Sequence, residues 1–161
     1  MSPARTDIVP YRRSRFATRL PVDRRYTPSH YWLREERPAV WRIGFTQFAT
    51  RMLGDIVECE FSTPVGSTVS PGDEIGGVEG FKAITVVYAV ASGVFQGRNG
   101  ELDADITAIE SDPYGRGWLY EVEGDPDPSS VDVHGYVGVL DATIDTMLAQ
   151  RHREGHDDGE T

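Results

Sequence analysis

The sequence lacks most of the features that point to a disulfide-rich, membrane-spanning or nucleic-acid-binding protein. Its 161 residues include one cysteine, which excludes an intramolecular disulfide framework and the common cysteine-rich zinc sites. No stretch approaches the roughly 18 consecutive apolar residues that a membrane-spanning helix needs. The 26 acidic side chains outnumber the 16 basic ones and give a net charge of −10, which argues against nucleic acid or an anionic membrane as a partner.

Catalytic and metal-binding motifs are also missing. The four histidines (His30, His134, His152 and His156) show no paired spacing typical of a metal site. There is no G-x-S-x-G nucleophile motif and no glycine-rich phosphate loop. No pair of carboxylates lies in an apolar setting that would separate their pKa values. These absences predict a protein that is not an enzyme and holds no metal ion.

Charge is unevenly distributed along the chain. Residues 1–25 carry seven arginines and two aspartates, and residues 151–161 contain no apolar side chain. Such blocks predict a basic, flexible extension over 1–25, a single domain over 26–150 and a disordered acidic tail over 151–161. The basic block is typical of a bacterial extension and thus of a cytoplasmic protein. The alternative is an organellar transit peptide and a location in the mitochondrial matrix.

The central part of the chain consists of short strand-like runs broken by glycine and proline. Residues 55–61 alternate, which predicts that Val57, Cys59 and Phe61 share one buried face and that Cys59 is a core residue. Further short strands with turns between them, for example at 40–45, favour a mainly β protein, a small sandwich or barrel with peripheral helices.

Two helices stand out against this background. Thr46 is placed to cap a short helix through residue 53, and Gly54 suits its left-handed stop. A longer C-terminal helix is predicted by apolar residues at helical spacing from Val133 to Leu148, with Ser129 or Ser130 as its cap.

The chain contains a single lysine, Lys82, while its other 15 basic residues are arginines. It lies between two strand-like runs that must reverse direction. Unlike an arginine guanidinium, a lysine ε-amine can be acylated to an amide or form a Schiff base. A solvent-exposed hairpin tip suits the attachment of a carried group. The alternative is one remaining lysine in a chain that otherwise uses arginine.

The residues around Lys82 resemble the lipoyl-attachment signature, and the chain as a whole is similar to the H-protein family of the glycine cleavage system. The resemblance covers residues 26–150 and rests on five segments: Tyr26–Trp32, Ile43–Ala49, Leu53–Val57, the Lys82 hairpin from Val69 to Val94, and Asp112–Leu119. A biotin carrier would flank the lysine with methionines, whereas this chain has Phe81 and Ala83.

The resemblance implies a barrel-sandwich hybrid with short helices and a C-terminal helix, in which Lys82 carries lipoic acid as N6-lipoyllysine. Gly80, Phe81 and Ala83 would surround the attachment point, and Glu79 would be recognised by lipoylating enzymes. The implied partners of this monomeric carrier are a pyridoxal-phosphate-dependent glycine decarboxylase, an aminomethyltransferase, dihydrolipoyl dehydrogenase and the lipoylating enzymes. Its implied role is to shuttle the aminomethyl group of glycine between the first two enzymes.

The family also implies a cleft for the lipoyl arm, to which Ser29, His30, Tyr31 and Val86 correspond. Tyr31 and Val86 stand where the family usually has acidic residues, and Gly80 replaces a common serine. A lipoyl arm with a cationic end would therefore have fewer acidic side chains to pair with in this cleft. Two alternatives stay open: an H-like lipoyl carrier for another pathway, such as lipoyl relay or sulfur oxidation, and an unmodified interaction module.

Overall fold

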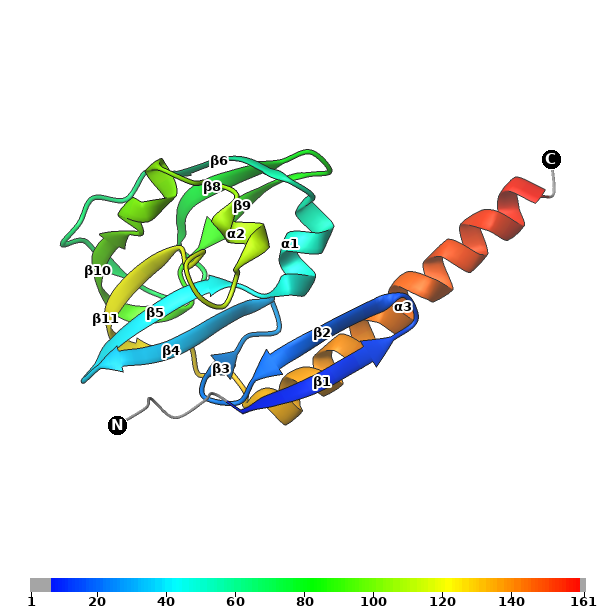
Figure 1. Ribbon diagram of the computed structural model, residues 1–161, viewed down its shortest axis with the longest axis horizontal. Helices are drawn as coiled ribbons and strands as arrows, with labels where there is room; N and C mark the ends of the chain where they lie inside the picture. The colour runs from blue at the N-terminus through cyan, green and yellow to red at the C-terminus, as the bar shows by residue number, and fades with distance from the viewer. Residues whose placement is uncertain (1–6, 160–161) are drawn as a thin grey trace.

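The computed structural model describes residues 7–159, with side chains through Glu154, and within this range the strands form two antiparallel sheets and a separate hairpin (Figure 1). The larger sheet has the order β3-β4-β5-β11-β10-β7. Its strands are β3 (Arg25–Tyr26), β4 (Tyr31–Arg37), β5 (Val40–Phe45), β7 (Thr68–Val69), β10 (Ala91–Arg98) and β11 (Tyr120–Pro126). The smaller sheet has the order β6-β8-β9 and consists of β6 (Ile56–Phe61), β8 (Glu74–Gly80) and β9 (Ile84–Tyr88).

A single apolar core lies between the two sheets. Both sheets contribute side chains that are almost fully buried, including Leu33, Ile43, Phe95, Tyr120, Ile75, Val78 and Val87. Cys59 is buried in the same cluster, as predicted. The mainly β, sandwich-like fold expected from the sequence is confirmed.

The strand alternation predicted for residues 55–61 is wrong at one position. A register shift between Ile56 and Glu58, opposite the end of β8, marks a β-bulge. A bulge inserts one extra residue and changes the faces on which the flanking side chains lie. Val57 is consequently 49% exposed, whereas Cys59 remains in the core.

The first predicted helix is confirmed as α1 (Gln47–Leu53). The Ala49 amide donates to Thr46 Oγ1, and Gly54 follows the helix with a φ of 75°, which favours glycine. The connection from β10 to β11 contains two shorter elements, the 3₁₀ helix η1 (Gly100–Asp103) and α2 (Ala108–Ser111).

The C-terminal helix α3 (Val133–Gly159) begins differently from the prediction. The Gly135 amide donates to Asp132 Oδ1 at 2.8 Å, so Asp132 caps the helix in place of Ser129 or Ser130. Ser130 instead accepts from Arg25 Nε at 2.7 Å. A carboxylate next to the first turn is also favoured by the helix dipole.

The N-terminal region differs from the flexible extension expected for residues 1–25. Strands β1 (Ile8–Arg13) and β2 (Phe16–Pro21) form an antiparallel hairpin that lies along α3 (Figure 1). A second buried cluster joins Phe16 and Leu20 to Tyr136 and Leu140 of α3, among others. The prediction rested on the many arginines of this region. Along β2, however, apolar and polar residues alternate, which is the pattern of a half-buried strand. Residues 1–6 lie outside the described residues.

The C-terminal segment also differs from the disordered tail that the sequence predicts. The sequence indicated disorder over 151–161, but α3 continues through Gly159 and extends beyond the hairpin (Figure 1). Extending an existing helix adds one hydrogen bond for each residue fixed, so a polar segment can remain helical once the preceding turns are anchored. Residues 160–161 lie outside the described residues.

Replacing Leu20 tests whether the hairpin is part of the folded unit. Leu20 is fully buried, so Leu20→Ala should lower the free energy of unfolding by about 2–5 kcal/mol, as measured by urea denaturation. Val22, at the end of the same hairpin, is 40% exposed, and Val22→Ala should cost less than about 0.5 kcal/mol. Equal stability of the two variants would contradict the packed hairpin.

Candidate functional site

The candidate site is the turn that joins β8 to β9 and carries Lys82 at its tip. The turn is fixed by main-chain hydrogen bonds to the segment that follows α1. The Lys82 amide donates to the Leu53 carbonyl at 2.9 Å, and the Phe81 amide donates to the Asp55 carbonyl at 3.0 Å. The backbone of the tip is therefore anchored, while the side chain of Lys82 is exposed.

Two glycines allow this close approach. A Cβ on Gly80 would lie 2.2 Å from the Leu53 carbonyl oxygen, and a Cβ on Gly54 would lie 2.9 Å from Lys82 Cγ. The Gly80 amide also donates to the Ala83 carbonyl at 2.9 Å, which closes the turn. Sequence analysis assigned Gly54 only to the end of the helix and did not foresee its contact with Lys82.

The surface around Lys82 is unusually apolar for an exposed turn. Phe81 is 79% exposed and Ile84 is 77% exposed, while Ala83 is also exposed. Among the side chains that the structure describes, Lys82 has no hydrogen-bond or ion-pair partner. An unpaired primary amine with apolar neighbours is available both for acylation and for contact with a modifying enzyme.

Glu79 occupies the exposed face of β8. It lines a shallow hollow of about 310 Å³ together with Glu58, Glu60 and Ile84. A hydrogen bond and charge repulsion from Glu60, with a smaller contribution from Glu79, raise the pKa of Glu58. Glu79 is thus part of an acidic strip on the outer face of the smaller sheet, beside the Lys82 turn.

The residues predicted for the arm cleft come together in one cavity. Ser29, His30, Tyr31 and Val86 line a space of about 370 Å³ that also reaches Ala83, next to Lys82. The remaining lining residues are Phe45, Phe48, Ala49, Met52, Leu53, Ile84, Thr85 and Tyr88. None of these side chains is acidic, so the cavity, hereafter the neutral cleft, holds no counter-charge for a cation.

His30 contributes no positive charge to the neutral cleft near neutral pH. Burial lowers its pKa to about 4, and its Nδ1 lies 2.8 Å from the hydroxyl of Tyr136 on α3. Its backbone has a φ of 73°, and its amide donates to the Thr27 carbonyl. His30 therefore forms part of the wall between the cleft and the second buried cluster.

Tyr31 is also a wall residue. Its ring is buried, and its hydroxyl accepts a hydrogen bond from the Tyr88 amide at 3.0 Å. Burial raises the pKa of Tyr31 to about 12, so the side chain remains neutral. The neutral tyrosine replaces the acidic group that the family resemblance implies at this position.

Two residues that line both cavities beside Lys82, Phe48 and Met52, were not predicted from the sequence. They lie one turn apart on α1, and both line the neutral cleft as well as a larger neighbouring cavity. Their spacing of four residues, which places them on one helix face, was the available signal.

The segment Asp112–Leu119 lines neither of the cavities that contain Phe48 and Met52, and it packs against the framework. Trp32 donates from Nε1 to the Pro113 carbonyl at 2.9 Å. The Arg24 guanidinium lies 4.7 Å from the centroid of the same indole. A Cβ on Gly117 would lie 2.1 Å from the Ala108 carbonyl oxygen. These contacts pack the segment closely against β4 and α2.

The amine of Lys82 and the cavities beside it suit a covalently attached acyl group. Lys82 supplies an exposed amine, and two cavities whose linings include large apolar side chains begin beside it. An amide at this nitrogen removes the lysine charge, which lets an attached chain lie against apolar surface.

Among the described residues, no group of three His, Cys, Asp or Glu side chains could hold a metal ion. None of the described helices is long and apolar enough to cross a membrane.

Comparison with known proteins identifies close similarity over most of the chain. A family model described as "Glycine cleavage H-protein" matches residues 24–133. The glycine cleavage system H protein of Pseudoalteromonas atlantica is 38% identical over 123 residues, which cover 76% of this chain and 90% of the relative. That of Myxococcus xanthus is 37% identical over 134 residues, covering 83% and 98%. A crystal structure of the H protein from Mycobacterium marinum aligns with a TM-score of 0.66 at 35% identity, covering 74% of this chain and 97% of that one.

The low pKa of His30 predicts a specific dependence of stability on pH. A histidine whose pKa is about 4 when folded and about 6.5 when unfolded destabilises the fold progressively as the pH falls from 6.5 towards 4. His30→Asn, which tolerates a positive φ, should weaken this dependence. Melting temperatures of the wild-type protein and the variant, measured between pH 7 and 4.5, test this prediction. The carboxylates titrate in both proteins, so the difference between the two pH profiles reports His30. Parallel pH profiles would contradict a buried, neutral His30.

Proposed function

The chain belongs to the glycine cleavage H-protein family, and we propose that it acts by carrying a lipoyl group in amide linkage to Lys82. The members of this family are non-catalytic lipoyl carrier subunits that work with the enzymes of the cleavage system. The observation that supports the assignment is the position of Lys82. It is the only lysine of the chain, and it lies exposed at the tip of an anchored turn, without an ion-pair partner among the side chains of residues 7–154.

Within this role, the protein's own residues attach, present and shelter the arm. When bound, lipoate supplies a dithiolane that is redox-active and accepts one-carbon cargo. Gly80 and Leu53 fix the turn from which the arm extends. Phe81 and Ile84 offer exposed apolar contacts to an approaching enzyme. Tethering the arm at a fixed point raises its effective concentration at each active site that the carrier meets.

The proposed partners are those of the cleavage cycle. They are the pyridoxal-phosphate-dependent glycine decarboxylase, the aminomethyltransferase, dihydrolipoyl dehydrogenase and the enzymes that attach lipoate. Glu79 beside the Lys82 turn is the proposed recognition residue for the lipoylating enzymes. The bacterial origin of the relatives supports a location in the bacterial cytoplasm.

One observation favours a second candidate, an H-like lipoyl carrier for another pathway. The neutral cleft contains no acidic side chain to hold a cationic arm end. Exchange between the carboxyl group of glycine and bicarbonate, measured with the lipoylated protein and glycine decarboxylase, separates the candidates. Robust exchange supports the glycine cleavage role, and absence of exchange from a fully lipoylated sample supports the other pathway.

Lys82→Arg tests the attachment site. The wild-type chain should gain the mass of a lipoyl group in cells that contain lipoylating enzymes, and the variant should gain none, because a guanidinium keeps the charge but is not acylated. The melting temperatures should agree closely, since the side chain is exposed. Intact-mass spectrometry decides the matter. An unmodified wild-type chain would support the unmodified interaction module, and equal modification of both chains would place the attachment elsewhere.

Gly80→Ala tests whether the anchored geometry of the turn matters for attachment. Its Cβ would lie 2.2 Å from the Leu53 carbonyl oxygen, so the tip must move. We expect lipoylation by a purified ligase to slow about tenfold or more. Gly77→Ala on the same strand is the matched control, because its Cβ would approach nothing closer than the Thr85 carbonyl at 3.6 Å. Equal rates for the two folded variants would show that the ligase does not depend on the turn geometry.

A further inference from the structure

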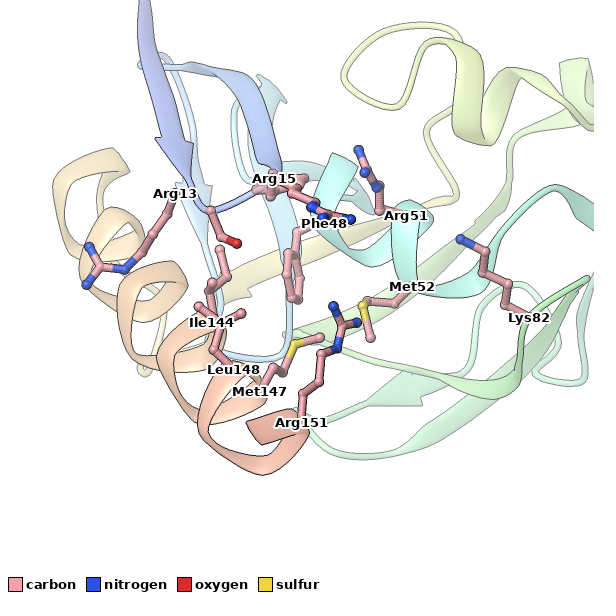
Figure 2. A pocket seen from close by; sticks show the side chains of 12 residues that line it. Arg13, Arg15, Phe48, Arg51, Met52, Lys82, Ile144, Met147, Leu148 and Arg151 are labelled. Atoms are coloured by element: carbon pink, nitrogen blue, oxygen red, sulfur yellow. The ribbon is translucent and has the colours of Figure 1, made fainter. Parts of the chain in front are cut away.

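A second cavity, larger than the neutral cleft, lies beside Lys82 on the other side of the α1 face. It has a volume of about 460 Å³, is open to solvent on one side and is lined by the β1–β2 turn, α1, α3 and Lys82 (Figure 2). The family model matches residues 24–133, so the β1–β2 hairpin and nearly all of α3 lie outside the match. Segments outside residues 24–133 therefore build most of this cavity, although the relative aligned over 134 residues also shares part of them.

The floor of the cavity is apolar. Its large apolar side chains are Phe16, Phe48, Met52, Ile144, Met147 and Leu148. Phe48 and Met52 also line the neutral cleft, so the two cavities adjoin along one face of α1. A chain attached to Lys82 therefore has apolar surface available in either direction.

The rim of the cavity is basic. Arg15 on the hairpin turn, Arg51 on α1 and Arg151 on α3 reach it from three separate elements (Figure 2). Among the side chains that the structure describes, none of these arginines has a hydrogen-bond or ion-pair partner. Arg13 differs, because Asp141 and Asp145 hold its guanidinium at 3.2 Å and 2.8 Å.

No acidic side chain of residues 7–154 lines this cavity. Lys82 and Arg51 also line a smaller hollow of about 270 Å³, to which Asp55 and Glu110 contribute carboxylates. Glu110 already accepts a hydrogen bond from the Ile56 amide at 3.0 Å. A chain with a net charge of −10 thus presents a positive patch at the place where the proposed arm is attached.

We propose that this cavity is a second docking site for the arm on Lys82, which accepts an uncharged or negatively charged arm end and rejects a positively charged one. The proposal rests on the lipoylation of Lys82 proposed above. Arg15, Arg51 and Arg151 attract an anion and repel a cation, and the apolar floor contacts the hydrocarbon part of the arm. A cationic arm end is left with the neutral cleft and with the small hollow that Asp55 and Glu110 line. The two cavities therefore sort the arm by the charge of its cargo.

Three matched arms test this selectivity. The dithiol of the lipoylated protein is reduced and alkylated with iodoacetate, iodoacetamide or 2-bromoethylamine, which gives negative, neutral and positive arm ends of similar size. Cys59 is buried and burial raises its pKa to about 11, so it reacts slowly, and intact mass confirms two additions per chain.

The methionine methyl groups report where the arm lies. The chain has three methionines, Met1, Met52 and Met147. Met147 lines only the basic-rimmed cavity, whereas Met52 lines both. In spectra of protein labelled with ¹³C-methyl methionine, the carboxymethyl and carbamidomethyl arms should shift the Met147 signal relative to the protein without an arm. The aminoethyl arm should shift Met52 alone. At low salt we expect the negative arm to populate the cavity about tenfold more than the positive arm, and 0.5 M salt should reduce this ratio.

Substitutions at the rim complete the test. The triple variant Arg15→Gln, Arg51→Gln, Arg151→Gln should abolish the difference between the negative and positive arms. Arg12→Gln, an exposed neighbour on β1 that does not line the cavity, should preserve it. A lipoylated protein whose Met147 signal is unchanged by every arm, or moves equally for negative and positive arms, would overturn the proposal. A chain whose mass shows no lipoyl group would instead overturn the proposed function, and this inference with it.

Discussion

The organisation of the site depends on one main-chain hydrogen bond, from the Lys82 amide to the Leu53 carbonyl. Leu53 is the last residue of α1, and the final carbonyls of a helix lack partners within the helix. The turn between β8 and β9 supplies one of these partners, so the smaller sheet and the helix stabilise each other where the lysine is presented. Gly54 and Gly80 are needed because side chains at either position would separate the two segments.

The anchored turn also explains why both cavities begin at the same residue. α1 lies between the larger sheet and the tip, and its exposed face separates a neutral space from a basic-rimmed one. The first is closed by His30 and Tyr31, whose burial keeps both side chains uncharged near neutral pH. The second depends on the N-terminal hairpin and α3, which pack on each other through Leu20, Tyr136 and Leu140. The hairpin and α3 therefore shape the surroundings of Lys82 from outside the central sandwich.

Features that depend on residues close together in the sequence could be predicted from local sequence patterns. The cap at Thr46, the stop at Gly54 and the burial of Cys59 follow from side-chain chemistry and alternation within a few residues. The single lysine and its flanking residues were sufficient to select Lys82, and the family resemblance grouped Ser29 and Val86 in the cleft that the structure contains.

The remaining features required knowledge of distant contacts. Val57 is exposed because a bulge forms opposite the end of β8, and residues 55–61 alone do not reveal the register of that pairing. The N-terminal hairpin appeared flexible because its arginines dominated the composition, although its apolar residues pair with α3 more than 100 positions later. The basic-rimmed cavity combines residues from four distant parts of the chain, so no local pattern marks it.

Hydrogen exchange at the backbone amide of Lys82 tests the central claim most directly, because the amide is anchored while its side chain is exposed. The structure predicts that the Lys82 and Phe81 amides exchange at least about 100-fold more slowly than in an unstructured peptide of the same sequence. Exchange of both amides at the rate of the unstructured peptide would contradict the account, because the lysine would then lie on a mobile loop rather than on a turn fixed to the end of α1.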